Sequence, residues 1–130
     1  MYTREVVEQG TLLILKAAGI LAGEELVATT RTLVDEGPTL ARVRTVLVLL
    51  DDVTQLAVGA EHVQKVVDLD RRLVEFLPKA DVAIVASRDE VYGMARMWEL
   101  MVGIPAWKIE VFRSRADADT WLAGRRAARP

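Results

Sequence analysis

The chain has 130 residues, of which 52% are hydrophobic and 28% are charged, and its formal net charge is −2. This size suits one domain spanning residues 1–130, whose hydrophobic core is large enough to be stable without disulfides or structural metals. The balanced charge excludes a strong attraction to nucleic acid or to an anionic membrane. The chain has no cysteine, which excludes disulfides, thiolate metal sites and cysteine nucleophiles and favours a cytoplasmic location. We expect no membrane insertion, since the apolar run 11–22 is shorter than the roughly 20 residues of a spanning helix.

The first third of the chain predicts two short strands and a helix. Residues 11–15 are rich in β-formers, and a second extended piece at 20–21 is expected to return beside them as an antiparallel pair. Helical spacing of apolar residues begins at Glu24. Gly37 and Pro38 are typical of a helix end.

The middle of the chain predicts a buried strand and a long helix. Residues 42–50 are apolar at every position of their second half, which is typical of a central strand covered on both faces. Asp51 and Asp52 are expected to close this strand. A helix is then expected over Gly59 to Leu77, where Pro78 follows.

The last third alternates strand and helix twice. The segment 81–86 reads as another buried strand, and residues 88–102 have helical spacing. Residues 107–112 alternate apolar with charged side chains, as an edge strand that is wet on one face would. A final helix contains residues 118–122.

Two of these helix starts show a hydroxyl followed three residues later by an acid, namely Ser87 with Glu90 and Ser114 with Asp117. This spacing is typical of capping boxes, so both serines are predicted to cap helices rather than to act as nucleophiles. The whole order is ββαβαβαβα. We therefore predict an α/β domain with a mixed five-stranded sheet and four helices.

The segments VAIVAS (82–87), VYGMARMWE (91–99) and EVFRSRADADTWL (110–122) resemble STAS/SpoIIAA-like domains, a group of anti-sigma-factor antagonists and SEC14-like modules. They are most similar to the bacterial subgroup of STAS/SEC14 domain-containing proteins. The resemblance covers nearly the whole chain. It implies a single-domain SpoIIAA-like (STAS) fold and a non-catalytic module that binds a protein partner.

One departure from that family concerns its phosphorylatable Asp-Ser-Ser/Thr-Gly element, which opens the helix after the central strand. The matching stretch here is LAVGAEHV (56–63). Ala57 and Val58 stand where a hydroxyl would be needed, and the nearest hydroxyl, Thr54, comes too early. By the resemblance, the chain keeps the fold and lacks the phospho-switch.

Support for an enzyme is limited to one pair of residues. Asp52 is expected at the carboxyl end of a central strand, where α/β proteins place functional groups, and His62 is the only histidine. A carboxylate and an imidazole can perform acid/base chemistry. Nothing repeats with metal-ligand spacing and no glycine-rich phosphate loop is present, so we predict no metal, no cofactor and no enzyme, and keep Asp52 with His62 as a third hypothesis.

Two helices carry more apolar surface than one sheet face needs. In the helix 59–77 the apolar positions cover an arc of about 180°, against the roughly 100° that a covering helix uses. His62 and Asp70 lie within this arc, about 12 Å apart along the helix. The surplus fits either a deeply covered helix or a helix that also serves a partner, such as a second copy in a homodimer.

The helix 88–102 has the same surplus. Met94, Met97 and Met101 provide a deformable apolar lining, Tyr92 widens the stripe, and Arg96 lies where an anionic head group could meet it. The first hypothesis is protein or self association, and the alternative is SEC14-like binding of a lipid or other apolar small molecule. The candidate binding residues are Tyr92, Met94, Arg96, Met97, Met101, Asp52, His62 and Asp70.

Overall fold

A five-stranded sheet forms the middle layer of the protein, whose computed structural model describes residues 2–128. The strands lie in the order β1-β2-β3-β4-β5; β1 is antiparallel to β2, and all other pairs are parallel. Their bounds are Tyr2–Val7, Leu12–Ala22, Thr45–Ala57, Ala80–Val85 and Trp107–Phe112. The predicted mixed sheet is confirmed.

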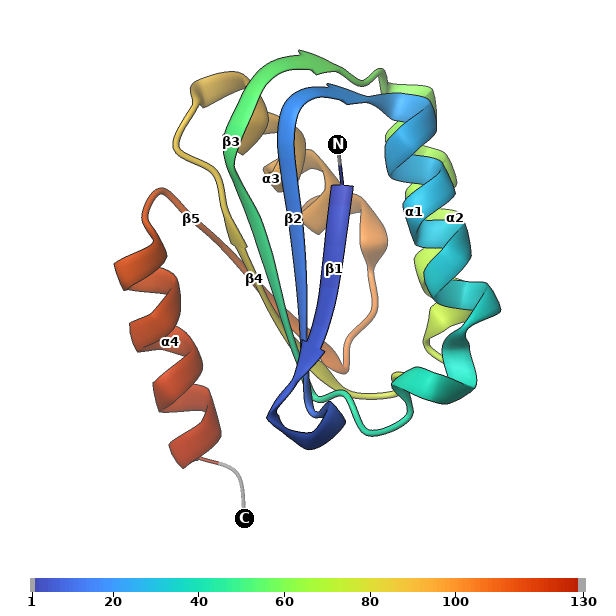
Figure 1. Cartoon of the computed structure of the whole chain (residues 1–130), viewed down its shortest axis with the longest axis vertical. Coiled ribbons are helices and arrows are strands. Elements are labelled where there is room, and N and C mark those ends of the chain that lie inside the picture. The colour runs from blue at the N-terminus through green and yellow to red at the C-terminus, as the bar shows by residue number, and fades with distance from the viewer. Residues whose placement is uncertain (1, 129–130) are drawn as a thin grey trace.

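Helices cover both faces of this sheet (Figure 1). Helices α1, α2 and α3 lie on one face, and α4 lies on the other. Their bounds are Gly23–Asp35, Ala60–Leu73, Asp89–Val102 and Arg115–Ala127. Short 3-10 helices occupy Glu8–Gly10 and Gly37–Leu40. The α/β class, the four helices and the order ββαβαβαβα are confirmed.

The central strand β3 contributes side chains to the hydrophobic cores on both faces of the sheet. Val46, Val48 and Leu50 pack beneath α1–α3, whereas Leu47 packs beneath α4. The predicted burial on both faces is therefore confirmed. The edge strand β5 also behaves as predicted, since Trp107 and Val111 are buried while its charged residues are exposed.

The antiparallel pair is not the predicted one. β1 pairs with β2, and the two predicted strands, 11–15 and 20–21, are parts of the single strand β2. The chain reverses at Glu8–Gly10, where all three residues have positive φ (54°, 60° and 89°). The prediction was wrong because β1 is a mostly exposed edge strand with polar residues at its centre, and such a strand lacks a hydrophobic alternation.

The strand β3 is longer than predicted. Asp51 and Asp52 do not close it, since it continues to Ala57. Its pairing with β4 ends at Leu49, but its pairing with β2 continues to Ala57. The two strands thus form a ribbon that projects past the rest of the sheet (Figure 1). Asp51 and Asp52 are exposed on this ribbon, whereas Val53 and Leu21 are buried.

The helix α2 is shorter than predicted. It begins at Ala60 and ends at Leu73, and backbone N–H groups of Phe76 and Leu77 bond to the Leu73 carbonyl in a closing turn.

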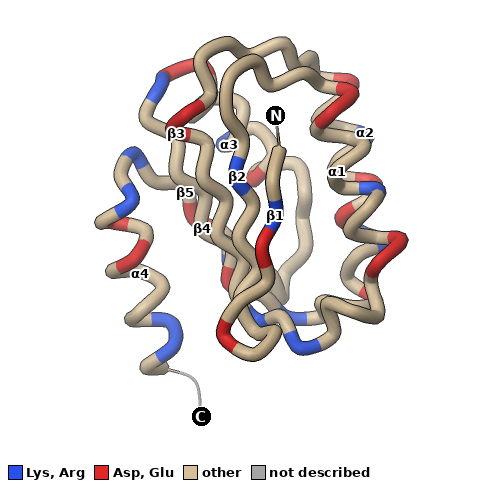
Figure 2. The backbone as a smooth tube through the Cα atoms, in the orientation of Figure 1, with Lys and Arg blue, Asp and Glu red and all other residues tan. Residues whose placement is uncertain are grey.

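Acidic and basic residues are interspersed along the elements (Figure 2). Within residues 2–128, none of the helices is both long and apolar enough to span a bilayer.

Of the two predicted helix caps, one is correct. The Ser114 hydroxyl accepts a hydrogen bond from the Asp117 N–H at 3.2 Å. The prediction for Ser87 is wrong, because the N-cap of α3 is Arg88 and makes no side-chain cap bond. The Ser87 backbone bonds instead to Asp51 and Arg113, so the β4–α3 connection is one residue longer than a capping box requires.

Ser114→Ala is expected to lower the free energy of unfolding by about 1 kcal/mol, because the variant leaves a helix N–H without its partner. Ser87→Ala is the matched control and should change stability by less than about 0.5 kcal/mol, since only its backbone is engaged. Urea unfolding followed by circular dichroism measures both. Equal losses in the two variants would contradict the assignment of the caps.

Candidate functional site

An apolar cavity of about 110 Å³ lies between the sheet and the layer formed by α1, α2 and α3. Its sheet side is built by aliphatic residues of β2, β3 and β4, and its helix side includes Val66, Asp70, Met94 and Ala95. No lysine, arginine or histidine is among the lining residues. A second hollow of about 300 Å³ beside the α3–β5 connection is more open to solvent than the first.

Asp70 is the ionisable acid in this cavity. This residue lies on α2 and is only 6% exposed. Its Oδ2 accepts a hydrogen bond from the Trp98 Nε1–H at 2.7 Å. The other oxygen, Oδ1, has no hydrogen-bond partner in the described part of the chain, yet protein atoms do not seal it off. Since Asp70 lines the cavity, we place Oδ1 against that space.

Burial changes the acidity of two lining residues. Desolvation raises the pKa of Asp70 from 3.8 to about 7, and the hydrogen bond from Trp98 offsets part of this rise. Desolvation also raises the pKa of Tyr2, and the negative charges of Asp70 and then Glu25 add to the effect. The phenol of Tyr2 is therefore neutral, and the electrostatic potential around it is negative.

Two other polar groups of the lining, the Thr30 hydroxyl and the Trp107 indole, have partners within the protein. The Thr30 hydroxyl donates to the Leu26 carbonyl at 3.0 Å. The Trp107 indole N–H donates to the Leu77 carbonyl at 2.7 Å. Asp70 differs from these two groups, because its Oδ1 has no hydrogen-bond partner among the described residues.

The candidate residues predicted on α3 occupy three different places. Met94 lines the cavity, whereas Met97 and Met101 are half-buried and pack with the α2 side chains Val63 and Val67. Tyr92 is half-buried at the start of the helix, and the Arg113 guanidinium lies 4.0 Å from the centre of its ring. The structure therefore joins Met94 to Asp70 and separates both from Tyr92.

Arg96 does not lie at the polar end of the cavity. It is absent from the lining residues and forms an ion pair with Glu99 at 2.7 Å, one turn along α3. The predicted position of Arg96 beside an anionic head group is not supported by this geometry.

Asp52 and His62 hold different partners. Asp52 pairs with Lys16 on the neighbouring strand at 3.1 Å. His62 Nδ1 accepts the Gly59 N–H at 3.0 Å, and its Nε2 lies 3.3 Å from Glu24. Within residues 2–128, no hydrogen bond or ion pair joins Asp52 to His62, and no three acidic or histidine side chains gather as a metal site requires.

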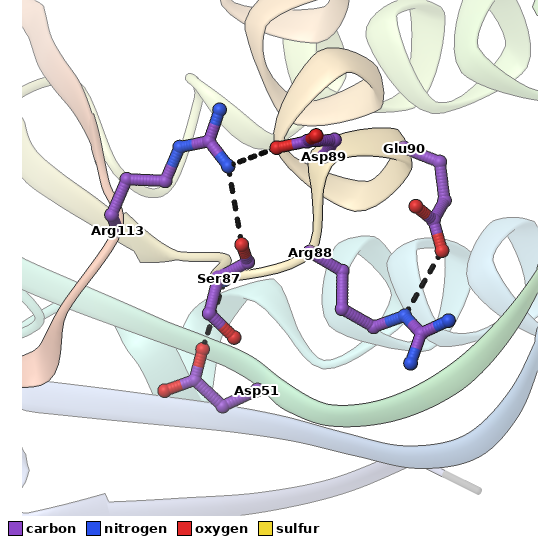
Figure 3. A network of polar contacts seen from close by, with 6 residues as sticks. All are labelled: Asp51, Ser87, Arg88, Asp89, Glu90 and Arg113. Atoms are coloured by element: carbon purple, nitrogen blue, oxygen red, sulfur yellow. Dashed lines mark hydrogen bonds and ion pairs between the residues drawn. The ribbon is translucent and has the colours of Figure 1, made fainter.

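A polar network lies at the carboxyl end of β4, beside Asp51 of β3, and positions α3 (Figure 3). Asp51 Oδ1 accepts the Ser87 N–H at 3.1 Å. Arg113, which follows β5, donates to the Ser87 carbonyl at 3.1 Å and to Asp89 at 2.6 Å. Arg88 and Glu90 form a separate pair beside them. These hydrogen bonds and ion pairs connect the start of α3 to β3 and to the residue after β5. They therefore fix the position of the helix that carries Met94, Ala95 and Trp98.

Sequence reasoning missed two members of the cavity and the residue that braces it. Tyr2 was overlooked because β1 was not recognised as a strand. Trp98 is an aromatic residue at helical spacing, and only its contact with Asp70 reveals a polar role. Arg113 follows a strand in sequence, and nothing local indicates that it reaches Ser87 and Asp89 on another element.

Comparisons with known proteins support the fold. No family model matches the chain, and no curated protein is significantly similar to it. A solved structure of the anti-sigma factor antagonist SpoIIAA in its unphosphorylated form aligns with a TM-score of 0.54 at 12% identity, covering 95% of this chain and 99% of that chain. An uncharacterised DUF3478-family protein with a SpoIIAA-like fold, from Shewanella loihica PV-4, aligns with a TM-score of 0.53 at 18% identity, covering 94% and 92%. The chain therefore has a SpoIIAA-like fold.

Proposed function

We propose that this chain is a non-catalytic binding module that holds a small apolar molecule in the cavity between α1–α3 and the sheet. The observation that carries the proposal is the apolar space of about 110 Å³ with a buried acid beside it. An apolar cavity of about 150 Å³ in another protein stays dry and binds benzene. The space here suits a single small ring or a short branched alkyl group.

A regulatory role through phosphorylation has less support. The helix α2 begins at Ala60 after Gly59, and the preceding Ala57 and Val58 carry no hydroxyl. The hydroxyl of Thr54 belongs to β3, ahead of the helix start. A switch that depends on a phosphorylated residue at this helix would need a hydroxyl that the chain does not place there.

The proposal is tested by titrating the purified chain with benzene, followed by the NMR shifts of residues that line the cavity. We expect saturable shifts centred on Met94 and Trp98. Ala95→Leu should abolish them, because the residue is 2% exposed and lines the cavity, so the larger side chain would fill it. Its stability should stay within about 1 kcal/mol of wild type, since the space accepts the added atoms.

The matched control is Ala118→Leu on α4. Ala118 is 0% exposed but packs in the opposite core, away from the cavity. There the added atoms overpack a filled site, so a loss of about 1–3 kcal/mol is expected, with benzene binding retained. Unchanged benzene binding in Ala95→Leu, with a stability loss as large as in Ala118→Leu, would refute a ligand site in this space.

A second candidate function is association of two copies through the outer face of α3. Leu100 favours it, because this leucine is 76% exposed beside the half-buried Met97 and Met101. Contiguous exposed apolar surface is typical of interfaces. Native mass spectrometry separates the two candidates, since a dimer mass supports association and a retained small mass supports the cavity ligand.

A further inference from the structure

We propose that the cavity selects small aliphatic amines, whose ammonium group pairs with Asp70 while the alkyl group fills the apolar space. This inference rests on the proposed function and adds the chemical class of the ligand. It depends on three features of the cavity: the free oxygen of Asp70, the sign of the charges around it, and the size of the space.

The first feature is a hydrogen-bond acceptor, on a buried residue, that opens to the cavity. Trp98 occupies Oδ2 of Asp70 at 2.7 Å and so fixes the orientation of the carboxyl group. Oδ1 has no partner within residues 2–128 and is not enclosed by protein atoms. A carboxylate oxygen that opens to an apolar cavity can accept a hydrogen bond from a ligand group that donates one.

The second feature is the sign of the charge. Among the described residues, the lining holds the acid Asp70 and no lysine, arginine or histidine. A carboxylate or phosphate ligand would meet repulsion there without a compensating cation, since Arg96 is paired with Glu99 outside the lining. An ammonium group would gain a charge-assisted hydrogen bond.

The aromatic residues of the lining support the same sign. Tyr2, Trp98 and Trp107 all border the cavity, and the faces of such rings attract cations. Among the described residues, the groups that act on Asp70 or border it in the lining include no cation, since Trp98 donates a hydrogen bond and the phenol of Tyr2 is neutral.

The third feature limits the ligand to a short chain. A cavity of about 110 Å³ is close in size to the roughly 150 Å³ cavity that binds benzene in another protein, so it admits a small ring or a short branched chain. A branched four-carbon group fits this range. Long-chain lipids exceed it.

The test uses three ligands that share one isobutyl group, titrated into the full chain at pH 8 and followed by NMR. Isobutylamine supplies an ammonium group, isobutanol a neutral donor and isovalerate an anion. We expect isobutylamine to bind at least tenfold more tightly than isobutanol, because hydrogen bonds to charged groups exceed neutral ones. Isovalerate should show no saturable shifts.

Asp70→Asn provides the decisive variant, because its amide oxygen can still accept the Trp98 N–H while the negative charge is lost. Isobutylamine affinity should fall about tenfold to a hundredfold. In the wild type, isobutylamine affinity should also fall below pH 7, whereas isobutanol affinity should not.

The outcomes separate this inference from the proposed function. Benzene binding without a preference for the amine, or amine affinity that survives Asp70→Asn, would overturn the amine site and leave the apolar site standing. Isovalerate binding equal to that of isobutylamine would also overturn it. If neither benzene nor isobutylamine enters the protein, both proposals fail.

Discussion

The Asp70→Asn variant is expected to be more stable than the wild type at pH 8, by up to about 4 kcal/mol. Desolvation holds the pKa of Asp70 at about 7 in the folded chain, against an ordinary value of 3.8. A difference of this size is equivalent to on the order of 4 kcal/mol. Asparagine has no charged form, so it avoids the cost of burying a carboxylate.

The sign of the pH dependence follows from proton linkage. Between about pH 4 and pH 7 the unfolded chain has lost the Asp70 proton while the folded chain still holds it, so wild-type stability falls as pH rises through this window. Above pH 7 both states are ionised and the contribution levels off. The variant should therefore match the wild type near pH 4 and exceed it increasingly up to pH 7.

Urea unfolding at a series of pH values, followed by circular dichroism, measures this difference. Asp68→Asn is the control, since Asp68 is exposed on the same helix and its replacement should shift stability by no more than about 0.5 kcal/mol at each pH. A constant difference between the Asp70→Asn variant and the wild type from pH 4 to pH 8 would show that Asp70 does not hold a proton in the folded state.

Gly23→Ala is expected to lower the free energy of unfolding by about 1–3 kcal/mol or more, because α1 begins against the ring of His62. A Cβ at Gly23 would lie 2.2 Å from His62 Cγ and Nδ1, closer than atoms pack. The ring cannot shift freely, since its Nδ1 accepts the Gly59 N–H at 3.0 Å. The backbone of α1 or α2 must therefore move.

Thermal and urea unfolding measure this effect, with Gly93→Ala on α3 as the matched control. A Cβ at Gly93 meets nothing within 4 Å, so alanine there should stabilise the helix by up to about 1 kcal/mol. In the Gly23→Ala/His62→Ala double variant, the clash is removed, and the combined loss should be smaller than the sum of the two single losses. Additive losses would contradict the packing of His62 on Gly23.

This packing gives His62 a structural role. Its ring bridges the start of α2, through Gly59, to the start of α1, through Gly23 and Glu24. The contact explains why the imidazole ring of His62 lies within the apolar arc of α2. An acid/base partnership with Asp52 would require His62 to leave these contacts.

Periodicity and local spacing are sufficient for much of the fold. The apolar run before Asp51 predicts a central strand, and the hydroxyl at Ser114 predicts a cap, because each depends on residues a few positions apart. The same reasoning fails for β1, whose partner β2 supplies the burial that its own sequence does not show. It fails for Ser87 because Asp51 and Arg113, distant in sequence, bind its backbone.

The candidate site divides in the same way. Local sequence places Asp70 within an apolar helix face and Met94 on the neighbouring helix, since helical geometry depends only on spacing. Their meeting beside one cavity, the hydrogen bond from Trp98 and the entry of Tyr2 from β1 depend on how the helices pack on the sheet. Desolvation is a property of that packing, so the altered acidity of Asp70 arises only when residues far apart in the chain exclude water together.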